Sequence, residues 1–324
     1  MSSKKLPLLI ISGATATGKT STSLHLAKKY QHLSPVIINV DSLLFYRELN
    51  IGTAKPSQQE RDEIEHRLID NRSINNPLNA ADFTTLALKE LEQCFENQRF
   101  PILVGGSGFY LRALVKGMYD SVDVSEEIKN DAEELFEREG IKPFIEFLNL
   151  NDPIRIKTLH ENDHYRIKRA YEHFKMTGKP TSQAGDQFAG GDPYDFSQHR
   201  LDNWNILHLY MELPRDEHAQ IIKDRTEQML TSGFVEETKT LLNNGFTGQE
   251  KPMQSIGYKE ILMMLNGELE QKDLQERIEG STRKLAKQQR TFFAKIRPKH
   301  SLHPLKDKVK IDQLVSDWMS EGDQ

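Results

Sequence analysis

The segment ISGATATGKTS at residues 11–21 is the most informative stretch of this chain. It contains the pattern G-x-x-x-x-G-K-[ST], which is typical of loops that bind phosphate groups. The apolar run LPLLIIS at 6–12 predicts a buried strand before the loop, and STSLHLAKKY at 21–30 predicts a helix after it. Strand, glycine loop and helix in this order direct backbone N–H groups and a helix N-terminus towards an anion.

We therefore expect residues 13–20 to bind a phosphate group. In such a loop Lys19 adds a positive charge, and the hydroxyl of Thr20 is placed to reach a magnesium ion. A Gly- and Thr-rich stretch also occurs in ordinary turns, but the flanking strand and helix favour the phosphate loop.

The composition indicates an ordinary soluble protein. The chain has 324 residues, of which 37% are hydrophobic and 28% are charged, and no apolar run is long enough to span a bilayer. The N-terminal apolar stretch is short and leads directly into the phosphate loop, so we do not interpret it as a signal peptide. The single cysteine, Cys94, excludes an internal disulfide framework and favours a cytoplasmic location. The net charge of −5 means that any surface for nucleic acid must be local.

The order of apolar and amphipathic segments predicts an α/β fold. Strands are expected at 6–12, 35–42 and 100–106, with a helix at 80–98 between the last two, which is typical of a parallel sheet covered by helices. A final strand is expected at 204–214, followed by helices at 215–231, 234–243, 255–266 and 271–296.

The middle of the chain has a different character. Charged helical patterns at 125–140 and 163–180 precede a polar, glycine-containing stretch at 183–199, which predicts a mainly helical insertion that ends in a flexible loop. We therefore divide the chain into a first part of the α/β core at 1–119, a helical insertion at 120–202 and a completion of the core at 203–324.

Three strand ends supply candidate functional groups, because ligands of open α/β sheets bind where parallel strands end. The first strand ends in the phosphate loop, the second at Asp41, and the third at the glycine-rich stretch 105–108, which contains Ser107 and is followed by Arg112. Asp41 has three readings that the spacing does not separate: a magnesium ligand, the N-cap of a helix in DSLLFYREL, or a general base beside the phosphate site.

Other polar segments have weaker signals. The loop NIGTAKPS at 50–57 is either a solvated turn or a surface where Thr53 and Lys55 face RNA or the site, and His66 reads as a structural histidine. The segment 281–300 contains seven Lys or Arg residues and no acid, and Arg283, Lys287 and Arg290 share one helical face. This single-sign run in an acidic protein favours contact with a phosphate backbone over a simple solvated surface.

Together these segments resemble the tRNA dimethylallyltransferase (tRNA isopentenyltransferase, or IPP transferase) family, in the family's order and over nearly the whole chain. The segments that carry the resemblance are GATATGKT, NVDSLLFYRELNIGTAKP, NAADF, LVGGSGFYLRAL, YRIKRAYEHFKMTGKP, RTEQMLTSGFVEE, QSIGYKE and TRKLAKQQRTFF.

The resemblance implies that the loop binds the diphosphate of dimethylallyl diphosphate rather than a nucleoside triphosphate. It implies transfer of the dimethylallyl group to N6 of adenosine 37 in tRNAs that read codons beginning with U, which gives N6-isopentenyladenosine and diphosphate. It favours Asp41 as the general base over a metal ligand, and implies Mg²⁺ as cofactor and the anticodon stem-loop of tRNA as partner. We also expect a monomer with no membrane association. The main alternatives are a small-molecule or nucleotide kinase with a phosphate loop, and an RNA-binding protein that uses the loop only to sense a nucleotide.

The implied site has four groups of residues. The catalytic residues are Asp41, Ser107 and Arg112; the diphosphate-binding residues are Gly13, Ala14, Thr15, Ala16, Thr17, Gly18, Lys19 and Thr20; the metal-binding residue is Thr20; and the tRNA-binding residues are Asp41, Ser42, Leu43, Leu44, Thr53, Lys55, Arg166, Gln254, Gly257, Tyr258, Lys259, Arg283, Lys287, Gln288 and Arg290.

Overall fold

The computed structural model describes residues 5–117, 124–183 and 191–321, which form two compact units. One unit joins Met1–Val115 to Tyr194–Gln324, and the other is Lys116–Pro193. The second unit ends earlier than the predicted insertion at 120–202, because Phe196 and Leu201 are buried in the core of the first unit. Residues 184–190 of the predicted flexible loop lie outside the described residues.

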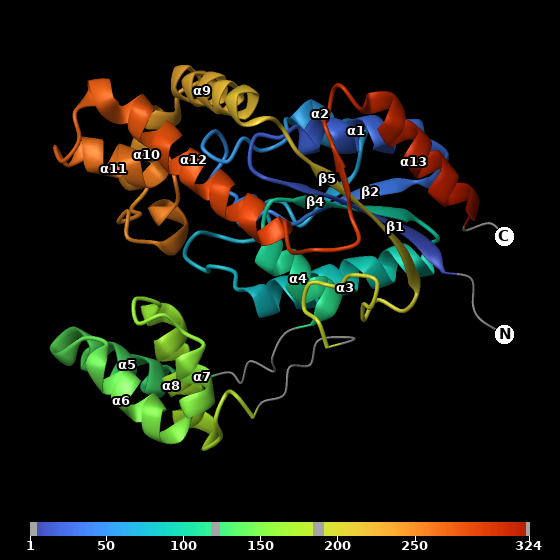
Figure 1. Ribbon diagram of the computed structural model, residues 1–324. Helices are drawn as coiled ribbons and strands as arrows, with labels where there is room; N and C mark the ends of the chain where they lie inside the picture. The colour runs from blue at the N-terminus through green and yellow to red at the C-terminus, as the bar shows by residue number, and fades with distance from the viewer. Residues whose placement is uncertain (1–4, 118–123, 184–190, 322–324) are drawn as a thin grey trace. The chain divides into compact units, whose positions relative to one another are not determined.

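The first unit is built on a sheet whose six described strands are all parallel, which confirms the α/β prediction (Figure 1). The strand order is β3-β2-β4-β1-β5-β6. The prediction that 204–214 holds the last strand is wrong, because the later segment His300–Leu302 pairs with β5 and extends the sheet. The strands are β1 (Leu6–Gly13), β2 (Pro35–Asn39), β3 (His66–Arg67), β4 (Phe100–Gly105), β5 (Trp204–Met211) and β6 (His300–Leu302).

Helices cover both faces of this sheet, as expected for parallel strands (Figure 1). On one face, Leu9 and Ile11 of β1 are buried in a cluster with α1 (Lys19–Lys29) and α13 (Lys308–Glu321). On the other face, Leu8 and Ile10 are buried in a cluster with α3 (Ala80–Glu96) and α4 (Gly108–Lys116). Alternate side chains of one strand therefore anchor the two layers of helices.

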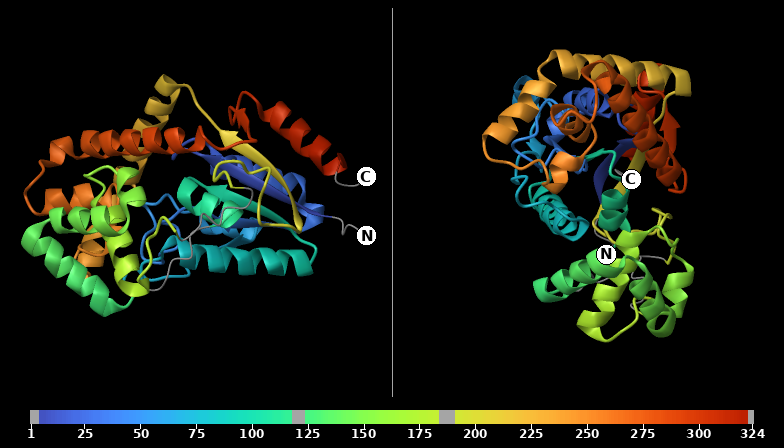
Figure 2. Two further views of the ribbon diagram at one scale, coloured as in Figure 1. Left: turned by 60° about the horizontal axis from the view of Figure 1, so that its bottom comes forward. Right: turned by 90° about the vertical axis from the view of Figure 1, so that its left-hand side faces the viewer.

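A third hydrophobic cluster lies beyond the carboxyl ends of the strands. Here α10 (Phe234–Asn243), α11 (Tyr258–Leu265) and the beginning of α12 (Leu274–Phe293) enclose Phe234 and Tyr258, whose rings meet edge to face at 4.8 Å. Figures 1 and 2 show α12 running from this cluster back to the sheet, while α9 (Arg215–Thr231) packs along it. The α12 helix thus connects the cluster to the end of the sheet where the phosphate loop lies.

The remaining elements of the first unit are short. They are α2 (Gln58–Glu63) and the 3-10 turns Gln31–Leu33, Lys251–Gln254 and Gln271–Asp273. Among the described helices, none combines the length and apolar character that crossing a bilayer requires.

The second unit is a small helical bundle with its own core. Phe144, Leu148 and Ile167 are buried at its centre. Asp152 is also buried and accepts hydrogen bonds from the Arg155 amide, the Thr181 hydroxyl and the Ser182 amide. Its helices are α5 (Glu126–Glu139), α6 (Lys142–Asn151), α7 (Pro153–Lys157) and α8 (His164–Thr177).

The ends of β2 and β4 approach so closely that only glycine fits at position 105. A Cβ atom added to Gly105 would lie 2.3 Å from the carbonyl carbon of Val40 and 2.8 Å from the amide nitrogen of Asp41. We expect Gly105→Ala to lower the free energy of unfolding by about 1–3 kcal/mol, because the two strand ends must separate. Urea denaturation followed by circular dichroism measures this change.

Gly280 in α12 provides the matched control. A Cβ atom there would have no neighbour within 4 Å, so Gly280→Ala should stabilise the helix by about 1 kcal/mol. Equal stability of Gly105→Ala and the unmodified protein would show that the strand ends are not held at this separation.

Candidate functional site

The phosphate loop between β1 and α1 is closed by contacts among its own residues. A Cβ atom at Gly13 would lie 2.6 Å from both the Met211 carbonyl oxygen and the Thr17 hydroxyl, so the residue must be glycine. Gly18 has the left-handed φ of 76° that begins α1. The Thr17 hydroxyl and Lys19 Nζ both donate to the Ala14 carbonyl, at 2.9 and 2.6 Å. Lys19 therefore lies folded across the loop.

Side chains from distant parts of the chain hold the tip of this loop. The Thr15 amide donates to Gln289 Oε1 at 2.8 Å, and the Thr15 carbonyl lies 2.7 Å from Nε2 of His218. The second nitrogen of His218 lies 2.9 Å from the guanidinium of Arg290. Neither Gln289 nor His218 was predicted as a site residue, and Arg290 was predicted to bind RNA rather than to support the loop.

The glycine-rich stretch after β4 forms the second wall of the site. The Ser107 hydroxyl accepts a hydrogen bond from the Ser42 amide at 3.0 Å, and the Gly106 carbonyl accepts one from Gln289 Nε2 at 3.0 Å. Ser107 thus joins the ends of β4 and β2, and Gln289 joins the end of β4 to the phosphate loop.

Asp41 lies at the end of β2 in a turn, not in a helix, so its reading as a helix N-cap is wrong. The side chain of Asn39 bonds both backbone groups of Asp41, with Oδ1 accepting from the amide at 2.7 Å and Nδ2 donating to the carbonyl at 2.9 Å. The Asp41 carboxylate accepts a hydrogen bond from the Leu43 amide at 3.1 Å, which is the hydrogen bond of an Asx turn. These bonds fix the position of a half-buried carboxylate.

Three charged side chains interact at this end of the sheet. Burial lowers the pKa of Lys19 to about 8, with the nearby Asp41 carboxylate opposing this shift and the Arg225 guanidinium adding to it. Burial also lowers the pKa of Arg225, and Asp41 again opposes the shift. Two cations and one carboxylate thus share a poorly solvated region, which suits a ligand with several negative charges. Arg225 comes from α9 and is a further residue that the sequence reasoning did not select.

Arg112 lies in aromatic surroundings one turn into α4. Its guanidinium is 5.2 Å from the ring centre of Phe109, 5.5 Å from that of Tyr194 and 5.6 Å from that of Phe292, and it donates to the Tyr194 hydroxyl at 3.3 Å. Direct contact between Arg112 and a diphosphate stays a prediction.

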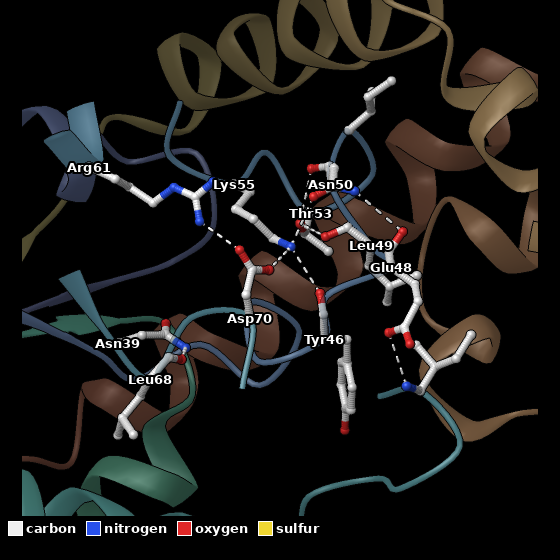
Figure 3. A network of polar contacts seen from close by, with 12 residues as sticks. Asn39, Tyr46, Glu48, Leu49, Asn50, Thr53, Lys55, Arg61, Leu68 and Asp70 are labelled. Atoms are coloured by element: carbon white, nitrogen blue, oxygen red, sulfur yellow. Dashed lines mark hydrogen bonds and ion pairs between the residues drawn. The ribbon is translucent and has the colours of Figure 1, made fainter. Parts of the chain in front are cut away.

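The loop 50–57 is held by polar contacts within itself and with neighbouring segments (Figure 3). Lys55 Nζ forms an ion pair with Asp70 and donates to the Tyr46 carbonyl at 2.9 Å and to Asn50 Oδ1 at 3.0 Å. Its side chain is only 4% exposed. The Thr53 hydroxyl donates to the carbonyls of Leu49, just before the loop, and Asn50. The structure places Lys55 inside this loop, and its contact with RNA stays a prediction.

Glu237 of α10 fastens this loop to the third cluster. Its carboxylate accepts hydrogen bonds from three backbone amides, those of Asn50, Ile51 and Gly52, at 3.2, 2.8 and 3.2 Å. It also accepts one from the Tyr258 hydroxyl at 2.5 Å. Within QSIGYKE, the predicted RNA-binding residues Gly257 and Tyr258 are buried, whereas Gln254 and Lys259 are exposed. Leu43 packs against the same cluster.

The basic face of α12 borders a groove of about 860 Å³. Arg283, Lys287 and Gln288 are exposed, and Arg290 is half-buried. Arg283 is paired with Glu279 at 3.2 Å. The charged residues that line the groove are Arg215, Arg283, Lys287, Arg290 and Lys299, with the single acid Glu212.

The remaining predicted residues lie elsewhere. Arg166 of α8 is 70% exposed on the second unit and lies 3.4 Å from Asp163. His66 on β3 contacts the Ile64 carbonyl at 2.7 Å, and the neighbouring Arg67 bonds Glu90 at 2.7 Å. Both arrangements are structural, as the sequence analysis expected for His66.

Comparison with known proteins agrees with this geometry. Residues 44–296 match the family model described as IPP transferase. The chain is 39% identical over 287 residues to a tRNA dimethylallyltransferase 1 of Trichlorobacter lovleyi, covering 88% of this chain and 90% of the relative. It is 35% identical to a tRNA dimethylallyltransferase of Dictyoglomus turgidum, covering 98% and 95% of the two chains.

Solved structures give the same result for the fold. The crystal structure of the tRNA isopentenylpyrophosphate transferase of Bacillus halodurans superposes with a TM-score of 0.69 at 28% identity and covers 98% of both chains. A eukaryotic dimethylallyltransferase acting on tRNA superposes with a TM-score of 0.79 at 24% identity, covering 98% of this chain and 80% of that one.

The lowered pKa of Lys19 predicts how the site responds to pH. Because this pKa is about 8, the amine loses its proton, and with it its attraction for an anion, as the pH rises through that value. Calorimetric titration with inorganic diphosphate from pH 7 to 9.5 measures the effect. The affinity of the unmodified protein for diphosphate, divided by that of Lys19→Met, should fall as the pH rises. Because diphosphate itself titrates equally in both measurements, its own protonation does not change this ratio. A ratio that stays constant over this range would show that the charge of Lys19 does not contribute to anion binding.

Proposed function

The chain belongs to the IPP transferase family, and we propose that it transfers the dimethylallyl group of dimethylallyl diphosphate to N6 of adenosine 37 in tRNAs that read codons beginning with U. The observation that carries this proposal is the meeting of the phosphate loop with Asp41: they follow β1 and β2, the two strands that flank β4, and the charges of Lys19 and Asp41 act on each other. A site for a diphosphate and a fixed carboxylate are the two components that this reaction needs.

The diphosphate is the leaving group. As the bond between C1 of the prenyl group and the diphosphate oxygen breaks, negative charge develops on the diphosphate. The loop amides, Lys19 and Arg225 stabilise that charge in a region where burial already disfavours uncompensated cations. Ser107 and Arg112 also stabilise this charge, and Ser107 in addition joins the ends of β4 and β2 through its bond to the Ser42 amide.

The adenine amino group is the nucleophile. Its lone pair is delocalised into the ring, so it attacks C1 effectively only when its proton is removed as the new N6–C1 bond forms. Asp41 accepts a hydrogen bond from the amino group and takes that proton, while Asn39 and the Leu43 amide keep its carboxylate in place. The base must leave the anticodon-loop stack to reach this carboxylate.

A magnesium ion fits the residues present at the loop. Within residues 5–117, 124–183 and 191–321 no cluster of three or more His, Cys, Asp or Glu side chains could hold a metal. This agrees with the usual magnesium site in phosphate loops, where one or two protein oxygens act together with substrate phosphates and water. The exposed Thr20 hydroxyl at the start of α1 would hold the ion, which would neutralise charge on the diphosphate.

The RNA partner is held by positive charge. The exposed cations of α12 bind the phosphate backbone of the anticodon stem-loop. Arg166 and the other exposed cations of the helical unit contact the same partner. The enzyme acts in the cytoplasm as a monomer.

The proposal is tested by incubating the protein with unmodified tRNA, Mg²⁺ and dimethylallyl diphosphate. Nucleoside mass spectrometry should show N6-isopentenyladenosine at position 37 only. Consumption of ATP with no modified nucleoside would favour a kinase, and RNA affinity that depends on ATP would favour a nucleotide-sensing RNA-binding protein.

Replacing the carboxylate of Asp41 should stop the reaction without displacing the substrates. We expect Asp41→Asn to lower kcat by about 10²–10⁴, the range that a general base contributes. The dissociation constant of tRNA should change less than about threefold, since phosphate contacts dominate RNA affinity. Single-turnover transfer and filter binding measure the two quantities.

Asp62→Asn, at an exposed position on α2, is the control and should be fully active. Rates like those of the unmodified enzyme in Asp41→Asn would remove the assignment of Asp41 as the base.

The α12 surface is tested by its salt dependence. The double variant Arg283→Ala and Lys287→Ala should bind tRNA more weakly, and the slope of log K against log salt should decrease in magnitude by about 1.4–1.8, since each lost phosphate contact removes about 0.7–0.9. The matched pair Lys308→Ala and Lys310→Ala removes two exposed cations from α13 and should leave the slope unchanged. Identical slopes for both double variants would show that the α12 face is only solvated.

A further inference from the structure

Thr15 at the tip of the phosphate loop is held on both sides by side chains from other elements. Its amide donates to Gln289 Oε1 at 2.8 Å, and its carbonyl accepts from His218 Nε2 at 2.7 Å. Gln289 is on α12 and His218 is on α9, so neither residue is close to the loop in sequence. A backbone residue whose two polar groups are fixed in this way cannot rotate without breaking one of the bonds.

Both polar groups of the Gln289 side-chain amide form hydrogen bonds. Oε1 accepts from Thr15, and Nε2 donates to the Gly106 carbonyl at 3.0 Å. The amide lies so close to the backbone that a Cβ atom at Gly106 would be 2.7 Å from Nε2. The Gln289 amide supplies both the acceptor and the donor that this position needs, whereas a carboxylate has no hydrogen for Gly106 and an apolar side chain has neither group.

His218 has one tautomer in this arrangement. Its Nδ1 lies 2.9 Å from Nη1 of Arg290, and a guanidinium can only donate, so Nδ1 is the acceptor. The hydrogen of the neutral ring is therefore on Nε2 and is donated to Thr15. Burial of the ring lowers the pKa of His218, which favours this neutral form. Two consecutive residues of α12, Gln289 and Arg290, thus support Thr15, the first directly and the second through His218.

The loop needs such support because its conformation is strained. Ala16, directly after Thr15, has φ of 60°, in the left-handed region that non-glycine residues rarely occupy. Loop amides stabilise a diphosphate only if they already point towards it, since ordering them on binding would reduce the affinity.

We propose that Gln289 and His218 are positioning residues that hold the phosphate loop through Thr15 in the conformation that binds the donor's diphosphate. The proposal deepens the proposed function and rests on it. It also gives α12 two roles in one helix: its exposed cations face RNA, and the next turn, with Gln289 and Arg290, sets the shape of the loop for the other substrate.

The test measures the affinity of the full chain for inorganic diphosphate, in the presence of Mg²⁺, by isothermal titration calorimetry. Gln289→Met keeps the length of the side chain and removes both hydrogen-bonding groups, and we expect it to weaken diphosphate binding about tenfold. In steady-state transfer at saturating tRNA, the KM for dimethylallyl diphosphate should rise by a similar factor, with the dissociation constant of tRNA unchanged within twofold. Gln313→Met, at an exposed position on α13, is the matched control and should bind like the unmodified protein.

His218 provides a second, independent pair of variants. His218→Leu removes the donor to Thr15 and should weaken diphosphate binding about tenfold, whereas His218→Gln keeps an N–H in reach and should restore most of that affinity. This rescue separates positioning from a general loss of packing. If Gln289→Met does not fold, this pair decides the question alone.

Unchanged diphosphate affinity in Gln289→Met or in His218→Leu would overturn the proposal, as would a loss confined to tRNA affinity, which would make Gln289 an RNA contact. Because calorimetry with inorganic diphosphate does not require prenyl transfer, a protein that binds diphosphate as described but modifies no tRNA would contradict the proposed function and leave the positioning roles standing.

Discussion

The close approach of three parallel strand ends is the constraint on which the rest of the site depends. The sheet places β4 between β1 and β2, so the phosphate loop, the glycine-rich stretch and Asp41 follow one another along one edge. Gly105 lets the backbone of β4 come within contact distance of Val40, and Ser107 then reaches the Ser42 amide. With a larger residue at 105, the carboxylate would move away from the loop, and the two halves of the reaction would lose their common site.

The charges at this edge are arranged for a ligand that is not part of the protein. Burial lowers the pKa of both Lys19 and Arg225, and a single carboxylate, Asp41, faces them. A polyanion such as a diphosphate would neutralise the excess positive charge of these two poorly solvated cations, which are already in place before it binds. In the proposed mechanism the Asp41 side chain, beside these cations, accepts the proton of the amine that replaces the diphosphate.

The parts of the structure that were predictable from the sequence are those encoded by neighbouring residues. The phosphate loop, the strands that lead to Asp41 and Gly105, and the helices at 215–293 all follow from local patterns. The β6 strand is not predictable because three residues carry no periodic signal, and the predicted helices do not include α13. The turn at Asp41 resembled a helix start, but the Asn39 and Leu43 bonds stabilise an Asx turn instead.

The contacts that hold Thr15 were not predictable, since they join residues more than 200 positions apart. Gln289 and His218 reach Thr15 from α12 and α9, and nothing in their own segments marks them. Lys55 shows the same limit: its segment does not indicate the ion pair with Asp70 or the bond to the Tyr46 carbonyl, and its contact with RNA stays a prediction.

The most direct test of the central claim, that one site binds the diphosphate and activates the adenine, is a crystal structure with an anticodon stem-loop and an unreactive thiodiphosphate analogue of the donor. The account predicts the adenine N6 at about 3 Å from the Asp41 carboxylate and about 3–3.5 Å from C1 of the analogue, whose diphosphate lies in the phosphate loop. An adenine and a diphosphate bound in separate cavities, with Asp41 facing neither, would contradict it.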